Sequence, residues 1–98
     1  MAEVVWTSNA LTDLSEIGEY IATDSLKFAE ITVSKLYHKV EILSTYPKSG
    51  RIVPETEQEN LRELIEGNYR IIYEIINDSI FILTVHHSSR DLKLKNDD

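Results

Sequence analysis

Two runs of β-branched and aromatic residues in the second half of the chain predict neighbouring strands. The first run covers residues 69–76 and the second covers residues 80–87. Both runs are too short and too closely bounded by polar residues for helices, and their composition is typical of strands. The pairs at 67–68 and 77–78 suit tight hairpins because Gly, Asn and Asp accept positive φ. Together with the run that begins at Leu61, the pattern predicts three antiparallel strands.

The register of the last strand decides which side chains lie beside Arg70. With two-residue turns on both sides, Arg70 sits opposite Val85, and Glu63 and His87 are diagonal to it on the same face, because side chains alternate along a strand. A three-residue turn before the last strand would shift that strand by one residue and place His86 beside Arg70 instead. Both registers are compatible with the sequence.

The opposite face of these strands is almost entirely apolar. We therefore expect the helices of the protein to pack on it. Its side chains are those of Leu64, Ile71, Tyr73, Ile75, Ile80 and Ile82.

The N-terminal part of the chain predicts one strand followed by a helix. A short apolar run at residues 3–6 precedes Thr7 and Ser8, so we expect a first strand that ends at a helix N-cap supplied by one of these two residues. The helix then runs to about Ala22, because apolar residues recur every three or four positions. This stripe consists of Leu11, Leu14, Ile17 and Ile21.

A second helix follows after only a few residues. Asp24 or Ser25 supplies its N-cap, and Tyr46-Pro47 ends it. Two helices with so short a connection must be antiparallel neighbours, so residues 8–46 form a helical hairpin. The predicted fold is α+β, in the order β-α-α-β-β-β, with this hairpin packed on a small, mainly antiparallel sheet. The apolar seam of the second helix is Ala29, Val33, Leu36, Val40 and Leu43.

Length and composition narrow the class of protein. We expect the 98 residues to form one domain over 1–98, with a frayed tail at 91–98. The chain has no cysteine, no apolar leader and no membrane-spanning run, so we expect a soluble, cytoplasmic protein without membrane contact. Its net charge of −7 opposes non-specific nucleic-acid binding, and we expect no direct sequence-specific DNA binding.

No familiar cofactor or metal motif is present. The chain has no phosphate-binding glycine loop and no zinc-ligand spacing, so we expect neither a cofactor nor a metal. His86 and His87 are adjacent on a strand and point to opposite faces, so they suit structural or solvated roles better than one metal site. Arg70 has two readings, as a structural partner of Glu63 or Glu74, or as a functional residue.

Several short motifs resemble, in their order, those of the RelE/ParE superfamily of type II toxins. They are Trp6-Thr7 with Ala10 and Leu14, Pro47 to Glu55, Leu61 to Leu64, Tyr69 to Tyr73 and His86 to Asp91. The resemblance covers nearly the whole chain and implies a toxin that is neutralised by, and forms an oligomer with, a cognate antitoxin. RelE-like members are ribosome-dependent endoribonucleases, whereas ParE-like members bind DNA gyrase and poison it.

A RelE-like nuclease needs basic residues and a proton donor in one cleft. Arg70 matches the family's central strand arginine, and Arg90 lies where RelE carries a second arginine. Leu61 and Glu63, however, stand where RelE has two lysines, and the C-terminal catalytic tyrosine has no counterpart. The resemblance therefore lacks most of the RelE catalytic set.

The related YoeB branch offers a different set of groups. Its Pro-Glu dipeptide, in which the glutamate acts as base, resembles Pro54-Glu55, and His86 or His87 could replace its histidine only in a shifted register. If the chain is a nuclease, the resemblance assigns catalysis to Glu55, Arg70, His87 and Arg90.

The missing nuclease groups, the acidic balance and the long helical hairpin resemble ParE. We therefore expect a toxin that binds DNA gyrase, arrests growth and acts by binding rather than catalysis. The alternatives are a RelE/YoeB-like ribosome-dependent mRNA endoribonuclease and a degenerate member that binds only its antitoxin. The expected target-binding residues are Arg62, Arg70, His86, His87 and Arg90.

Overall fold

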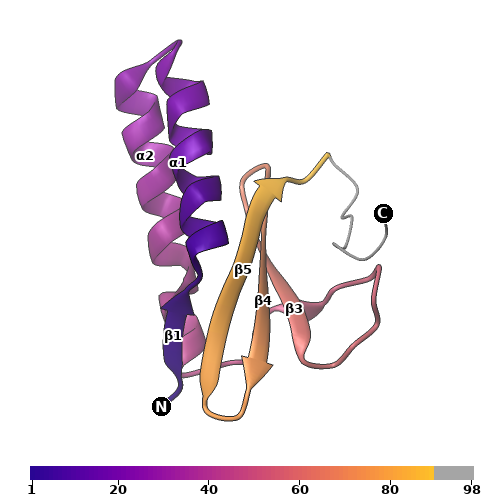
Figure 1. The fold of residues 1–98 in the computed structure, drawn as a ribbon. Helices are drawn as coiled ribbons and strands as arrows, with labels where there is room; N and C mark the ends of the chain where they lie inside the picture. Colours follow the sequence, from indigo (N-terminus) through magenta and orange to yellow (C-terminus); the bar gives the residue numbers. More distant parts are fainter. Residues whose placement is uncertain (90–98) are drawn as a thin grey trace.

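The computed structural model describes residues 1–89 and has two layers, a helical hairpin and a five-stranded sheet (Figure 1). The elements are β1 (Glu3–Trp6), α1 (Ser8–Ala22), α2 (Leu26–Lys39), the 3₁₀ helix η1 (Val40–Ser44), β2 (Arg51–Ile52), β3 (Leu61–Glu66), β4 (Tyr69–Ile76) and β5 (Ser79–His87). The predicted α+β order is confirmed, and β2 is added to it. The tail predicted at 91–98 falls outside the described residues. Within those residues, no helix combines the length and apolar character needed to cross a bilayer.

Side-chain caps fix where the two long helices begin. The Thr7 hydroxyl accepts a hydrogen bond from the Ala10 N–H, and the Ser25 hydroxyl accepts one from the Phe28 N–H. Of the predicted candidates, Thr7 rather than Ser8 is therefore the N-cap of α1, and Ser25 rather than Asp24 is the N-cap of α2. Since each cap satisfies a backbone donor that the helix cannot, both starting points are defined by sequence.

The second helix changes form near its end. The sequence predicted a continuous helix to about residue 46, but α2 ends at Lys39 and η1 continues it as a 3₁₀ helix. Side chains three residues apart lie over one another in a 3₁₀ helix. Val40 and Leu43 are three residues apart, and both are buried in the core. The tighter winding thus keeps both side chains directed at the sheet.

The sheet has the order β1-β5-β4-β3-β2. Strand β1 runs parallel to β5, so the first and last strands of the chain are neighbours, and the other pairs are antiparallel. Strand β2 is not among the strands predicted from the sequence. This strand has two residues, Arg51 and Ile52, which pair with Glu63 and Arg62 of β3.

Both hairpin turns have two residues, as predicted, and Gly67 and Asn77 adopt positive φ in them. Between β4 and β5, however, the register shifts at a β-bulge that leaves Leu83 as an extra residue. Arg70 therefore pairs with His86, and the prediction of Val85 opposite Arg70 is wrong. The shifted register is correct, although a bulge causes it rather than a three-residue turn.

The bulge also moves the neighbours of His86 to the other face. Val85 becomes part of the core under the helices. His87 pairs with Tyr69, so the prediction that His87 lies diagonal to Arg70 on one face is wrong as well. The other diagonal neighbour, Glu63, is on the predicted face, and it contacts Arg70 directly.

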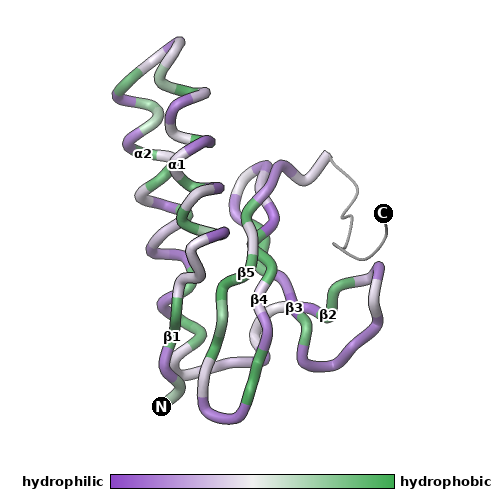
Figure 2. The backbone as a smooth tube through the Cα atoms, in the orientation of Figure 1, coloured by the Kyte–Doolittle hydropathy of each residue, from purple (hydrophilic) through white to green (hydrophobic). Residues whose placement is uncertain are grey.

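The helix face of the sheet is the side that packs on α1 and α2, and it holds the main core. The predicted apolar set is confirmed there, fully or largely buried except for the half-buried Ile75. Figure 2 shows hydrophobic residues along much of β4 and β5 and a hydrophilic loop after β2. The helices contribute Ala10, Leu14, Leu36, Val40 and Leu43 to this core.

The distal face is the side of the sheet that points away from the helices. Its apolar part is small, consisting of Val53, Leu61 and Ile72 with Leu83 packed against them. Beside this apolar part, the face carries charged side chains from β2, β3 and β4. These charges define the candidate site.

Candidate functional site

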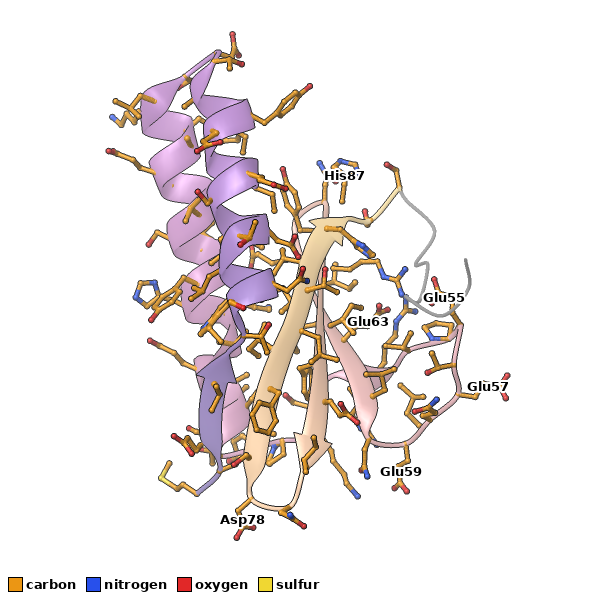
Figure 3. The ribbon with its side chains drawn as sticks, viewed as in Figure 1. Glu55, Glu57, Glu59, Glu63, Asp78 and His87 are labelled. Atoms are coloured by element: carbon orange, nitrogen blue, oxygen red, sulfur yellow. The ribbon has the colours of Figure 1, made fainter. Side chains whose placement is uncertain are left out.

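Four charged side chains meet on the distal face, from β2, β3, β4 and the loop after β2. Arg51 pairs with Glu63 across β2 and β3, and Arg70 lies on β4 diagonal to Glu63. Because alternate residues of a strand share a face, these three side chains converge. Glu55 reaches them from the loop. We call Arg51, Glu55, Glu63 and Arg70 the charge cluster; Figure 3 labels its two glutamates, one on the sheet and one on the loop.

Glu63 is the buried centre of the charge cluster. Its side chain is 0% exposed, yet it lies between two arginines. One carboxylate oxygen accepts from Arg70 Nε at 2.6 Å, and the other accepts from Arg51 Nε at 2.5 Å. A buried carboxylate is costly unless it is paired and hydrogen-bonded. The two guanidinium groups supply that pairing.

Arg70 also forms a bidentate ion pair with Glu55. Arg70 Nη1 donates to Glu55 Oε2, and Nη2 donates to Glu55 Oε1, each at 2.9 Å. Such parallel bonds match the planar shapes of guanidinium and carboxylate. Hydrogen bonding to Glu55, and then to Glu63, raises the pKa of Arg70, although burial opposes the shift. Arg70 therefore stays charged, and the described charge cluster contains two cations and two anions.

The loop that carries Glu55 is anchored by Val53, whose side chain is fully buried. The Val53 N–H donates to the Leu61 carbonyl, and the Val53 carbonyl accepts from the N–H groups of Thr56 and Glu57. Glu57 has a positive φ of 57°, which closes the turn. These bonds hold the backbone of the loop beside the sheet, and the Glu55 side chain extends from it to Arg70.

Tyr73 holds the connector between η1 and β2, residues 45–50, by two hydrogen bonds. Its hydroxyl donates to the Pro47 carbonyl at 2.6 Å and accepts from the Gly50 N–H at 3.0 Å. A Cβ atom on Gly50 would lie 2.5 Å from the Glu63 carbonyl oxygen, so only glycine fits there. Burial raises the pKa of Tyr73, against the smaller effect of the Gly50 hydrogen bond. The Tyr73 hydroxyl therefore helps to position the connector and Arg51, which follows it.

Arg62 braces the same connector rather than joining the charge cluster. It pairs with Tyr73 across β3 and β4, so it lies on the other face from Glu63. Its guanidinium donates to the carbonyl groups of Glu59 and Gly50, each at 2.9 Å. Arg62 and Arg70 were both predicted to bind the target, but the structure places their side chains on opposite faces of the sheet.

The two histidines are separated in the structure. His86 is half-buried beside Arg70. His87 is exposed, and its ring packs edge-on against Tyr69 with centroids 5.6 Å apart. Among residues 1–89, no group of His, Cys, Asp and Glu is arranged to hold a metal ion. The structure therefore brings together Arg70, Glu55 and His86 of the predicted residues, whereas Arg90 lies outside the described part of the chain.

Side chains from α1 hold the bulge that sets this register. The Asn9 amide donates to the Leu83 carbonyl at 2.9 Å. One Asp13 oxygen accepts from the Thr84 hydroxyl at 2.6 Å and from the Val85 N–H at 2.9 Å. The helix thus satisfies backbone groups at and beside the bulge, in the register in which His86 pairs with Arg70. No local pattern in the sequence indicates these roles of Asp13 and Arg51.

A second candidate surface lies on the helical hairpin. A shallow groove of about 670 Å³ runs between α1 and α2, and its lining is largely apolar. Gly18 allows the two helices to approach closely, because a Cβ atom at this position would lie only 3.1 Å from Val33 Cγ2. Several large apolar side chains on the hairpin are exposed, which is typical of a binding surface. They include Tyr20, Leu26, Phe28, Ile31 and Tyr37.

Comparison with protein-family models finds a match over residues 4–92 to the ParE toxin of type II toxin–antitoxin system, parDE. Among characterised sequences, Toxin RelE2 of Caulobacter vibrioides is 35% identical over 91 residues, which cover 92% of this chain and 99% of that protein. The match therefore extends over almost the full length of both sequences.

Two solved structures share the fold. One belongs to the chromosomal ParDE system from P. aeruginosa, with a TM-score of 0.74 and 23% identity over 89% of this chain and 96% of that one. The other belongs to the toxin–antitoxin complex RelBE2 from Mycobacterium tuberculosis, with a TM-score of 0.63 and 22% identity over 88% and 90%. At these identities, the likeness concerns the fold alone.

Proposed function

Because the chain belongs to the ParE toxin family of type II toxin–antitoxin systems, we propose that it arrests growth by binding a target protein, and that this target is DNA gyrase. The family resemblance implies gyrase. The charge balance of the distal face supports binding over RNA cleavage, and it is the observation on which the choice rests.

Cleavage of RNA at this face would require cationic groups that are available to a phosphate. The three nitrogen atoms of Arg70 all donate to carboxylates in the charge cluster. Arg51 donates to Glu63 as well. Glu63, which stands where RelE has a lysine, would repel a phosphate. A neutral, hydrogen-bonded surface of this kind is better suited to contact with a protein.

Gyrase supercoiling in vitro tests the proposal. Purified wild-type protein should inhibit the supercoiling of relaxed plasmid DNA and increase the amount of cleaved DNA trapped on the enzyme. Arg70→Ala should lose this effect. Lys35→Ala removes the same charge from an exposed position on α2 and should retain it. Unchanged supercoiling at all protein concentrations would contradict gyrase as the target.

A ribosome-dependent endoribonuclease is the second candidate. Glu55, Arg70 and His86 lie close together on one face, and a carboxylate, a guanidinium and an imidazole can in principle serve as base, phosphate ligand and acid. The names of the matched proteins do not choose between the branches, since one is a ParE model and the other is RelE2.

We also propose that a cognate antitoxin neutralises the protein by covering the helical hairpin and an edge of the sheet, forming an oligomer with it. The groove between α1 and α2 is apolar and suits an amphipathic segment. Hydrogen exchange should show protection of residues 8–46 when antitoxin is added. Protection confined to other residues would contradict this placement. A chain that binds antitoxin tightly but never arrests growth would be a degenerate member.

A further inference from the structure

We propose that Glu55 occupies an anion site on Arg70 that is used by a carboxylate of the target protein, and that the target displaces Glu55 when it binds. The Arg70 anion site is the position faced jointly by Nη1 and Nη2 of Arg70. The inference rests on the proposed function in taking a protein as the ligand. The site itself is a property of the isolated chain.

The two glutamates of the charge cluster differ in how firmly they are held. Glu63 is 0% exposed and accepts from both arginines, so its removal would leave buried charge without its partner. The Glu55 side chain is 34% exposed and comes from a loop. If Glu55 turns outward, its carboxylate enters water. Glu55 is therefore the exchangeable member of the cluster.

Displacement of Glu55 requires no rearrangement of the loop backbone. The loop stays anchored through Val53, which is buried and hydrogen-bonded to Leu61. The Glu55 side chain can rotate while this anchor stays in place. Arg70 meanwhile remains in place, since Glu63 still accepts from its Nε.

The Arg70 anion site favours a carboxylate by shape and by charge. Without Glu55, the described cluster has two guanidinium groups and one carboxylate, so it carries a net positive charge. Nη1 and Nη2 hold the two Glu55 oxygens at equal distances of 2.9 Å, which fits a planar carboxylate. The chain's net charge of −7 opposes a polyanion such as nucleic acid. An Asp or Glu side chain on a protein meets both conditions.

Acetate binding to the isolated protein tests the site directly. The Arg70 Nε–H signal of ¹⁵N-labelled protein is followed as sodium acetate replaces sodium chloride at constant ionic strength. Glu55→Ala should show a saturable shift at an acetate concentration roughly tenfold below that needed by wild type. Glu59→Ala is the matched control, because Glu59 lies on the same loop, points outward in Figure 3 and contacts only Lys48 among the described ion pairs. It should behave as wild type.

Two results would overturn the proposal. One is an acetate response that is the same in Glu55→Ala, Glu59→Ala and wild type. If the alanine variant unfolds, Glu55→Gln, which retains the size of the side chain, takes its place in the test. The other is inorganic phosphate binding more tightly than acetate to Glu55→Ala, which would assign the site to a phosphate. Acetate binding without any effect on gyrase would contradict the proposed target and leave the site standing.

Discussion

The two faces of the sheet are stabilised in different ways. The helix face is largely apolar, and the hydroxyl of its buried Tyr73 is satisfied by hydrogen bonds to the backbone of Pro47 and Gly50. The distal face buries Arg70 and Glu63 and compensates their charges within the cluster. Apolar burial is non-directional and roughly proportional to area, whereas a buried ion pair depends on geometry and contributes little net stability. Apolar burial on the helix face therefore supplies most of the stability of the fold, whereas the distal face keeps a defined arrangement of charges.

The largest effect is expected on the helix face. Leu36→Ala should lower the free energy of unfolding by about 2–5 kcal/mol, because Leu36 is 0% exposed and its loss leaves a cavity. Urea denaturation measures the change. Leu11→Ala, at an exposed position on α1, should cost about 0.5 kcal/mol or less. Equal costs at the two positions would contradict the packing described here.

On the distal face, Glu63→Gln should cost about 2–3 kcal/mol, because two charge-assisted hydrogen bonds are weakened in a buried place. Glu66→Gln makes the same change on the same strand, where Glu66 pairs with Lys39 at 3.8 Å near the surface. It should cost about 0–1 kcal/mol. If Glu63→Gln proves neutral in urea denaturation, the distal face is not held by its charges.

The contact between α1 and the bulge should have a smaller effect. Asp13→Ala should cost about 1–2 kcal/mol, because the Val85 N–H and the Thr84 hydroxyl lose their acceptor. The chemical shift of His86 should also change, since its register depends on the bulge. Glu16→Ala, on an exposed position one turn along α1, serves as control and should change neither quantity. An unchanged His86 signal in Asp13→Ala would show that the bulge holds without α1.

Tyr73→Phe should cost about 1 kcal/mol at neutral pH, through its lost hydrogen bonds. It should also change the alkaline pH dependence. Since burial raises the pKa of Tyr73, the folded chain retains this proton longer than the unfolded chain does, and wild-type stability falls as pH rises above about 10. Tyr73→Phe should reduce that fall in urea denaturation, whereas the exposed Tyr46→Phe should not. A slope that is identical in all three proteins would contradict the buried phenol.

The elements and the helix face could be predicted from the sequence because each rests on a local, repeated pattern. Caps such as Thr7 and Ser25 mark helix starts, and alternation along β4 separates core residues such as Ile71 from Arg70. These signals need no knowledge of distant contacts. They correctly placed β1, β3, β4, β5, the helical hairpin and the face on which the sheet and the hairpin meet.

The distal face depends on features that leave no such pattern. Strand β2 has two residues, too few for an alternation, so the sequence does not indicate that Arg51 lies beside Glu63. The bulge at Leu83 is stabilised by α1, about 70 residues away in sequence, so the choice between Val85 and His86 beside Arg70 was not determined by local residues. The brace formed by Arg62 depends on the path of the connector.

The most direct test of the central claim, that the distal face with its charge-balanced cluster binds a protein and does not cleave RNA, is primer extension on a ribosome-bound transcript. Purified protein is added at the concentrations that inhibit gyrase supercoiling. We expect no cleavage above that of ribosomes alone, because Glu55 and Glu63 neutralise Arg70 and Arg51. Codon-specific cuts that disappear in Arg70→Ala would contradict the account and place the protein among the ribosome-dependent nucleases.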